Sequence, residues 1–394
     1  MNRAASRAAQ LASGFFLFAA TLLAMWGGFE LLFPRILTAL PLNLQPYVPK
    51  PFGILCQSSK AGTLPRDWIA LLGDSYAKGS GDWLHNANPW RNPPFHSAHL
   101  IHEALGADVV NFGHGGAGSA DSLVMVPLPE LAALRDRFDI ADPRLVLAYF
   151  YEGNDLEDNV GMVRREIGLL REGRLDKEAF DDLLRRKLRS DPNTGPSGAF
   201  LATRFTIALV RNLEARLRGW RSRAPQHSPP EYGAYNKAAL VGVEVNLPLS
   251  LQGPALTLLD SEIDLALEVF ERSLRFLRSE LRAPRIAVVY IPSVLSCYAL
   301  HGTVSSWVHQ GHTALQPAVL VRERSDRIAK RVAEAAARSG ARFIDTREAV
   351  REAATRAVLH GPRDWDHFNR RGYEAFSAAV VAGLREEPAH EPGR

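Results

Sequence analysis

The chain has 394 residues and a mass of 43.4 kDa, with 46% hydrophobic and 23% charged residues. This length suits one large domain or two modest ones, and the composition excludes a mainly disordered chain, a collagen-like repeat and a multi-pass membrane protein. The net charge of +4 comes from 47 basic and 43 acidic residues, which does not indicate a nucleic-acid partner. Two cysteines exclude a disulfide-dense scaffold and a four-cysteine zinc site.

An uncharged apolar run over residues 11–29 predicts a membrane anchor near the start of the chain. Roughly 20 apolar residues at about 1.5 Å each cross a hydrocarbon core of about 30 Å, and the run is longer than the core of a signal peptide. A buried helix of a soluble domain is the less favoured alternative. Arg3 and Arg7 favour a cytoplasmic N-terminus. Residues 1–33 are therefore predicted to form a single-pass anchor in the inner membrane, with the rest of the chain on the periplasmic or extracytoplasmic side.

Five prolines between residues 34 and 51 predict an extended, proline-rich tether over residues 34–66. Outside the cytoplasm, Cys56 and Cys297 are candidates for one disulfide, although two separate buried thiols are an equally favoured interpretation. At the other end of the chain, residues 387–394 are predicted to be a disordered tail.

Five short apolar runs without alternation predict strands that are covered on both faces, as in a parallel sheet. The runs are residues 68–72, 108–112, 145–150, 286–291 and 342–345. Helical patterns lie between or after them at residues 97–105, 260–281, 317–339 and 371–384. This alternation predicts an α/β fold over residues 67–386, a three-layer α/β/α sandwich around a five-stranded, mainly parallel sheet.

Residues 160–255 do not follow this alternation of strands and helices and are interpreted as an insertion. The segment is rich in arginine and partly helical, with helices expected over residues 177–189 and 200–218. Ordinary packing on the parent domain is the favoured interpretation. Contact of its apolar helix faces with a membrane or a partner is the alternative.

Chemically useful residues follow the predicted strands, and the carboxyl ends of parallel strands meet at one edge of a sheet. Ser75 follows the first strand, Asn154 follows the third, and Asp364 and His367 follow the fifth after a helix and loop. We interpret Ser75 as a nucleophile, His367 as its general base and Asp364 as the carboxylate that orients the imidazole. Asp366 is a less favoured candidate for that carboxylate, because it is adjacent to the histidine.

A negative oxygen develops during acyl transfer, and donors must already point at it. The backbone N–H groups of Ser75 and Gly116 and the side-chain amide of Asn154 are the predicted donors of this oxyanion hole. Residues expected to support the site are Gly73, Asp74 and Asp155.

This ordered set resembles the four sequence blocks of the SGNH (GDSL) hydrolase superfamily. The matching residues are Gly73-Asp74-Ser75, Gly116, Asn154 in Gly-Asn-Asp, and Asp364 with His367, and the resemblance covers residues 67–160 and 284–383. It implies a flavodoxin-like strand order of 2-1-3-4-5 and ester hydrolysis without a metal. Two departures are Glu152, where the family usually has glycine, and the insertion, which has no counterpart in small esterases. Membrane-tethered members of the family often act on acyl groups of envelope polysaccharides, and some transfer acetyl groups.

The leading hypothesis is a membrane-anchored serine esterase acting on O-acyl esters, chiefly O-acetyl groups of an envelope glycan. The alternatives are an O-acetyltransferase with the same triad, a non-catalytic scaffold subunit of an envelope assembly and, more weakly, a lipase. The residues imply no metal and no cofactor, since His96, His99 and His102 drift around a helix and do not converge on one ion. The aromatic and amide groups of residues 83–91 either line a sugar cleft or pack on the domain.

Overall fold

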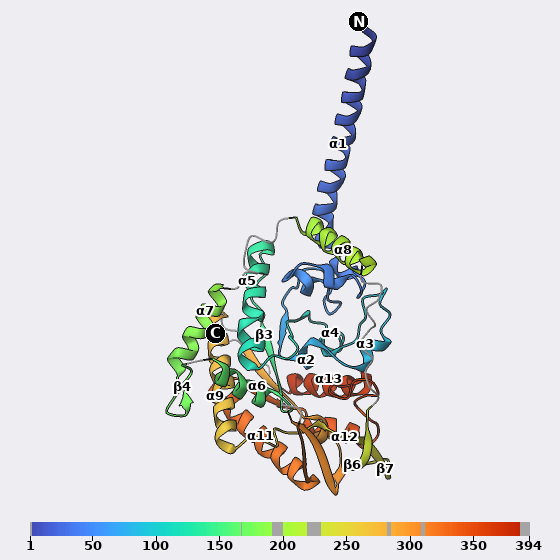
Figure 1. Cartoon of the computed structure of the whole chain (residues 1–394). Helices are drawn as coiled ribbons and strands as arrows, with labels where there is room; N and C mark the ends of the chain where they lie inside the picture. Colours follow the sequence, from blue (N-terminus) through green and yellow to red (C-terminus); the bar gives the residue numbers. More distant parts are fainter. Residues whose placement is uncertain are drawn as a thin grey trace.

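The computed structural model of the chain describes residues 2–166, 168–190, 200–218, 230–281, 285–308 and 312–386. The predicted disordered tail at residues 387–394 lies outside the described residues. Between these limits the chain forms one central sheet with helices on both faces, from which a long N-terminal helix projects (Figure 1).

Five parallel strands form the central sheet in the order β13-β9-β3-β1-β2, which is the 2-1-3-4-5 order expected from the sequence. The strands are β1 (Ile69–Leu72), β2 (Val109–Asn111), β3 (Leu145–Tyr151), β9 (Arg285–Ile291) and β13 (Arg342–Asp345). Ile69 of the central strand pairs with Val109 on one side and Leu145 on the other. Every residue of β1 and β3 is buried, which explains why these runs show no alternation in the sequence.

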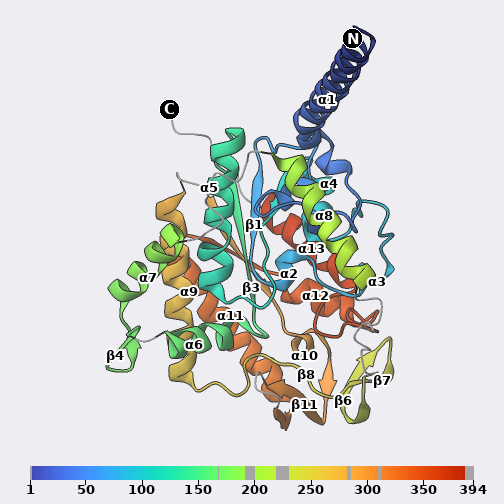
Figure 2. The same ribbon diagram turned by 45° about the horizontal axis from the view of Figure 1, so that its top comes forward.

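Helices cover both faces of the sheet, so the predicted three-layer α/β/α architecture is confirmed (Figure 2). Ala70 and Leu72 contribute to the core on one face, and Ile69 and Leu71 contribute to the core on the other. The first face is covered by α5 (Pro127–Phe138), α6 (Asp155–Arg165), α9 (Asp260–Glu280) and α11 (Ala318–Arg338). The second face is covered by α2 (Ser75–Lys78), α4 (Ser97–Leu105), α12 (Arg347–Ala354) and α13 (Arg370–Arg385). Two shorter helices are α3 (Asp82–Asn86) and α10 (Val294–Cys297).

The N-terminal helix α1 (Asn2–Ile36) is long and apolar enough, over Ser13–Ala39, to cross a membrane. The expectation that residues 34–66 form an extended tether is wrong. After α1 the chain folds into three short 3₁₀ helices, η1 (Leu37–Ala39), η2 (Gln45–Tyr47) and η3 (Phe52–Cys56). Their apolar residues, such as Leu37 and Phe52, are buried in the core on the first face of the sheet. Proline is compatible with such tight turns, and the apolar residues between the prolines supply the packing.

The insertion at residues 160–255 contains the two predicted helices, α7 (Lys177–Ser190) and α8 (Leu201–Arg218). The helix α7 packs on the parent domain, because Phe180 and Leu184 are buried in the core and Asp181 pairs with Arg272 of α9. The sequence did not predict the strands that lie outside the central sheet. They are β4 (Leu170–Arg171), β5 (Arg174–Leu175), β6 (Tyr232–Leu240), β7 (Val243–Pro248), β8 (Leu251–Gln252), β10 (Leu300–His301), β11 (Thr303–Val308) and β12 (His312–Pro317).

The proposed disulfide between Cys56 and Cys297 is contradicted, because both thiols are free and buried. Cys56 belongs to the core on one face of the sheet and Cys297 to the core on the other, so the sheet separates them. Burial raises the pKa of Cys56 to about 12 and raises the pKa of Cys297 well above its usual value. Both thiols are therefore protonated and unreactive at neutral pH.

Candidate active site

Ser75 begins the short helix α2 directly after strand β1. The turn is tight, because a Cβ on Gly73 would lie 2.8 Å from the Cβ of Tyr149, and Gly73 has a φ of 147°. The carboxylate of Asp74 accepts a hydrogen bond from the backbone N–H of Tyr76 at 2.9 Å and so caps the helix. The predicted supporting residues Gly73 and Asp74 thus place Ser75 at a helix N-terminus on the carboxyl edge of the sheet.

The structure brings Ser75 together with Asp364 and His367, a pair that lies almost 300 positions later in the sequence. The Nε2 atom of His367 lies 2.8 Å from the Ser75 Oγ. Its Nδ1 atom lies 2.8 Å and 3.0 Å from the two carboxylate oxygens of Asp364. Asp366, the less favoured candidate, makes a different contact: its backbone carbonyl accepts a hydrogen bond from the Tyr76 hydroxyl. Asp364 is therefore the carboxylate that holds the imidazole ring.

The charges of the site follow from burial and from this contact. Burial lowers the pKa of His367, but the hydrogen bond and charge of Asp364 outweigh burial, so that the pKa lies above 6.5. Burial raises the pKa of Asp364, but its bond to His367 outweighs burial and the net pKa is lowered. Burial also raises the pKa of Asp74 to about 6. An imidazolium at position 367 is thus stabilised by a carboxylate that stays ionised.

A glycine-rich loop after strand β2 runs alongside the serine. The backbone N–H of His114 donates to the carbonyl of Gly73 at 3.0 Å, which fixes the loop to the end of β1. A Cβ on Gly113 would lie 2.0 Å from the backbone nitrogen of Lys78, so only glycine allows this approach. A Cβ on Gly115 would lie 3.7 Å from the Ser75 Cβ. Gly116 follows with a φ of 71°, so the predicted oxyanion-hole residue lies in the loop beside the nucleophile candidate.

Asn154 lies at the end of β3, next to β1 in the sheet, where it precedes α6. Its side-chain oxygen is buried and has no hydrogen-bond partner among the described residues. Asp155 anchors this corner by accepting a hydrogen bond from the Tyr151 N–H at 2.9 Å. Burial, together with the charge of Asp74, raises the pKa of Asp155 well above its usual value. Asp155 thus supports the loop that presents Asn154 at the same edge of the sheet as Ser75.

Sequence reasoning missed the residues that tie the histidine loop to the segment around Ser75. The carboxylate of Asp82 accepts a hydrogen bond from the backbone N–H of Arg363 at 3.0 Å. The hydroxyl of Tyr76 donates to the Asp366 carbonyl at 2.8 Å, and that of Tyr373 donates to the Ser80 carbonyl at 2.6 Å. These contacts join residues more than 280 positions apart, and no spacing in the sequence indicates them.

Glu152, the departure from the family pattern, has a structural role. Its carboxylate is fully buried and accepts hydrogen bonds from the backbone and side chain of Ser293, at 2.9 Å and 2.8 Å. Ser325 donates to it at 2.8 Å, and the Tyr290 hydroxyl also donates to it. Because these partners lie on or after β9 and on α11, Glu152 joins β3 to its neighbours.

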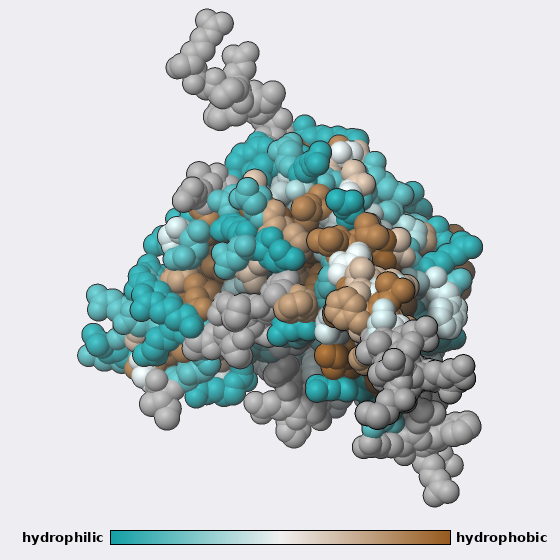
Figure 3. All heavy atoms as spheres, turned by 90° about the horizontal axis from the view of Figure 1, so that it is seen from above, coloured by the Kyte–Doolittle hydropathy of each residue, from teal (hydrophilic) through white to brown (hydrophobic). Residues whose placement is uncertain are grey.

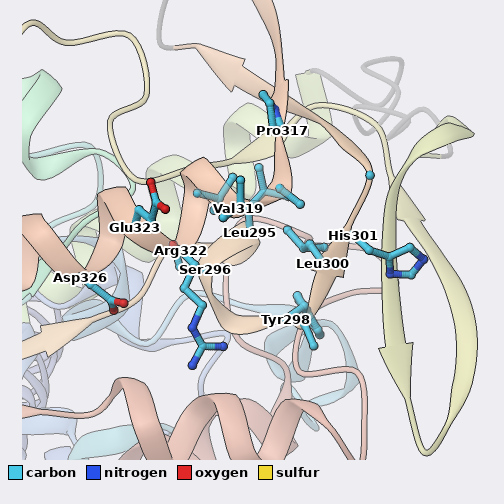
Figure 4. Close-up of a pocket in the computed structure, with 14 residues that line it drawn as sticks. Leu295, Ser296, Tyr298, Leu300, His301, Pro317, Val319, Arg322, Glu323 and Asp326 are labelled. Carbon is cyan, nitrogen blue, oxygen red and sulfur yellow. The ribbon is translucent and has the colours of Figure 1, made fainter.

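Two cavities lie near this edge of the sheet. A cavity of 460 Å³ borders the site, with Lys78 and His114 on one wall and Leu42 and Ile54 of the N-terminal segment among the others. A pocket of 630 Å³ lies between α10, β10 and α11, and its labelled lining side chains include none of the Ser75 triad (Figure 4). The lining of the 460 Å³ cavity includes Gly113 and His114 of the glycine-rich loop that runs alongside Ser75.

The remaining predicted features have separate surroundings. His96 caps α4 by accepting the Ala98 N–H at 3.1 Å, and burial lowers its pKa to about 4. His99 contacts Glu103, and His102 contacts the Ala107 carbonyl, so the three imidazoles face different partners. In residues 83–91, the indole of Trp83 is buried and donates to the Gly79 carbonyl, whereas Trp90 is 71% exposed.

The chain shows distant likenesses to known structures. Similar solved structures include an aryl esterase of M. smegmatis, with 14% identity, 81% of this chain and 98% of that chain covered and a TM-score of 0.33. A phospholipase A1 of Streptomyces albidoflavus NA297 has 13% identity, coverage of 80% and 98% and a TM-score of 0.36. An extracellular lipase of Streptomyces rimosus has 14% identity, coverage of 80% and 98% and a TM-score of 0.37. No curated protein matches the chain. We draw no conclusion about substrate from these distant likenesses.

The family assignment rests on the sequence itself. The profile of the GDSL-like lipase/acylhydrolase family matches residues 71–375, a range that contains every block quoted above and spans well over half of the chain. The protein therefore belongs to the GDSL-like lipase/acylhydrolase family and is a hydrolase of ester bonds.

Proposed function

We propose that the protein is a membrane-anchored serine esterase that hydrolyses O-acyl esters through an acyl-Ser75 intermediate. The observation that carries this proposal is the hydrogen-bond chain in which His367 lies 2.8 Å from the Ser75 hydroxyl and 2.8 Å from the Asp364 carboxylate. A serine hydroxyl is a poor nucleophile until a base takes its proton, and an imidazole at this distance is positioned to do so.

In the proposed reaction the Ser75 Oγ attacks the ester carbonyl carbon while its proton passes to His367 Nε2. The bond to the alcohol oxygen then breaks, and that oxygen takes the proton from His367. Water attacks the acyl carbon, gives a proton to His367 and releases the Ser75 Oγ, which recovers the proton. Asp364 stabilises the imidazolium in both halves of the reaction. The N–H groups of Ser75 and Gly116 and the amide of Asn154 are the proposed oxyanion donors.

The proposed substrate is an O-acyl group, chiefly O-acetyl, on an envelope glycan. The cavity bordered by the glycine-rich loop combines charged and amide side chains, such as Lys78 and Gln57, with apolar ones. This mixture suits a hydroxylated acceptor better than a long acyl chain. Trp90 offers an exposed indole in the segment after the serine helix, and such a flat apolar face packs against sugar rings.

The proposed anchor is α1. Its apolar side chains are exposed over most of its length, for example Phe15 at 74% and Leu23 at 73%. Such a surface is unfavourable in water and suits the interior of a bilayer. Together with Arg3 and Arg7, this supports a single-pass protein of the inner membrane with its catalytic domain on the periplasmic or extracytoplasmic side.

The experiment compares the wild type with Ser75→Ala on a short-chain aryl ester and on a fluorophosphonate probe. Loss of the nucleophile is expected to lower kcat by about 10⁶-fold and to abolish labelling. Ser80→Ala, which changes a nearby serine outside the hydrogen-bond chain, is the matched control and should keep both the wild-type kcat and the labelling. Equal rates for wild type and Ser75→Ala would refute the assignment. Product analysis with and without a glycan acceptor separates hydrolysis from acetyl transfer.

A further inference from the structure

The start of helix α8 is held by a side chain of α1. The two carboxylate oxygens of Glu30 accept hydrogen bonds from the backbone N–H groups of Ala202 at 2.9 Å and Thr203 at 2.7 Å, and one of them also accepts the Thr203 hydroxyl. The Trp26 indole donates to that hydroxyl at 2.8 Å. The first N–H groups of a helix lack intrahelical partners and favour a negative charge, so Glu30 fixes α8 to α1.

This contact lies where α1 leaves the core of the domain. Below it, Phe33 and Leu37 are almost completely buried, and the Phe33 ring lies 4.9 Å from the ring of Phe205 on α8. Above it, 22 residues separate Arg7 from Glu30 in the sequence. At about 1.5 Å per residue they span about 33 Å, close to the thickness of a hydrocarbon core. Glu30 and the adjoining α8 therefore fall at the polar boundary of the bilayer, where an indole such as that of Trp26 is favoured.

Among the described residues, helix α8 carries an exposed apolar surface at this level. Ile207, Val210 and Leu213, here called the α8 stripe, recur every three residues and are 45%, 56% and 58% exposed. Arg204 and Arg211 are exposed on the neighbouring flank of the helix. Figures 1 and 2 show α8 running obliquely across the foot of α1. Figure 3 shows hydrophobic side chains gathered on the face from which α1 rises.

Exposed apolar side chains also occur on α1 close to its contact with α8. Leu31 and Leu32 at the foot of α1 are 77% and 56% exposed, on the same helix that the proposed function places in the membrane. An exposed apolar stripe beside arginines is the pattern of a helix that lies in the interface of an anionic bilayer. The positive charge of Arg204 and Arg211 is complementary to lipid phosphates. The position of α8 next to α1 places the α8 stripe at the level of those phosphates.

We propose that α8 is an interfacial membrane helix whose α8 stripe inserts among the lipids beside α1 and fixes the orientation of the catalytic domain. This proposal rests on the proposed anchoring of α1. The occupant of the surface is the anionic lipid bilayer itself, with Arg204 and Arg211 at the level of the phosphates. Two contact points, α1 and α8, prevent the domain from rotating freely about the anchor.

The test uses the full chain reconstituted in vesicles of phosphatidylcholine and phosphatidylglycerol, with an NBD fluorophore on one introduced cysteine. Val210→Cys reports on α8, and Phe18→Cys reports separately on the anchor. Val243→Cys is the matched control, since it is 62% exposed on β7 at the opposite end of the domain (Figure 1). Because the native cysteines are buried, the unsubstituted chain serves as the labelling blank. Nitroxide-bearing lipids are expected to quench the Val210→Cys emission by about half and to leave Val243→Cys unchanged.

Each result decides the proposal. Quenching at Phe18→Cys without quenching at Val210→Cys would overturn the role of α8 and leave the anchor in place. Absence of quenching at Phe18→Cys would overturn the proposed anchoring and the role of α8 with it. A blue-shifted but unquenched Val210→Cys would show that a protein surface covers the stripe, which also overturns the proposal.

Discussion

The substitution Asp364→Asn removes a charge from the hydrogen-bond chain and leaves its shape almost unchanged. The carboxylate lies 2.8 Å from His367 Nδ1, and both side chains are about four-fifths buried. At an effective dielectric constant of about 20, opposite unit charges at this distance attract by about 6 kcal/mol. This attraction exists only when the imidazole is protonated, as it is during acyl transfer, so its loss lowers kcat by about 10⁴-fold.

The pH profile supplies a second readout of the same substitution. The Asp364 carboxylate keeps the pKa of His367 above 6.5 against the opposing effect of burial. Without that carboxylate, burial dominates and the acidic limb of kcat/KM moves to lower pH. Both quantities are measured with a short-chain aryl ester across the pH range, and circular dichroism confirms that the variant is folded.

Asp366→Asn is the matched control, because it removes a neighbouring carboxylate that does not bind the imidazole ring. Its kcat is expected to fall by less than about tenfold. A loss of less than about tenfold for Asp364→Asn, or an acidic limb that does not move, would refute the assignment of this carboxylate.

Three further predictions concern the surroundings of the site. Gly113→Ala places a methyl group 2.0 Å from the Lys78 nitrogen, so both Tm and kcat should fall, and unchanged values would contradict this close approach. Glu152→Ala leaves buried donors without an acceptor and should lower the free energy of unfolding, measured in urea, by about 3 kcal/mol. A change near zero would contradict the structural role of Glu152. The wild-type kcat/KM should rise through an acidic limb whose midpoint lies above the usual pKa of a histidine, since the base form of His367 is required and its pKa is raised; a midpoint below that usual pKa would contradict this.

The sequence predicted the central sheet because each of its strands is a continuous apolar run bounded by turn residues. Burial on both faces requires such runs, so the five strands and the helices between them can be predicted from the local sequence. The triad could be predicted for a related reason. Ser75 and Asn154 each follow a predicted strand, and the Asp364–His367 pair follows the last predicted strand after a helix and loop. In a parallel sheet the carboxyl ends of the strands lie at one edge, so these residues come together.

The features that the sequence did not predict depend on long-range packing. Residues 34–66 look extended because of their prolines, and only the finished core shows that Leu37 and Phe52 are buried. Asp82 and Tyr373 hold the histidine loop through contacts to distant backbone groups, for which no periodicity exists. Strands of the small outer sheets, such as β6 and β11, lack a strong pattern, because each sheet covers only part of the domain.

Because the segment after α1 is buried in the core, α1 joins the α/β domain without an extended linker. Leu42 and Ile54 of this segment line the cavity that the glycine-rich loop borders, so the chain runs directly from α1 to the neighbourhood of that loop. If α1 holds the enzyme in a membrane, the distance of Ser75 from the lipid surface is then fixed, and the serine can act only on esters close to that surface. A shortened chain that begins at residue 67 would lack Leu42 and Ile54 and therefore one wall of the cavity.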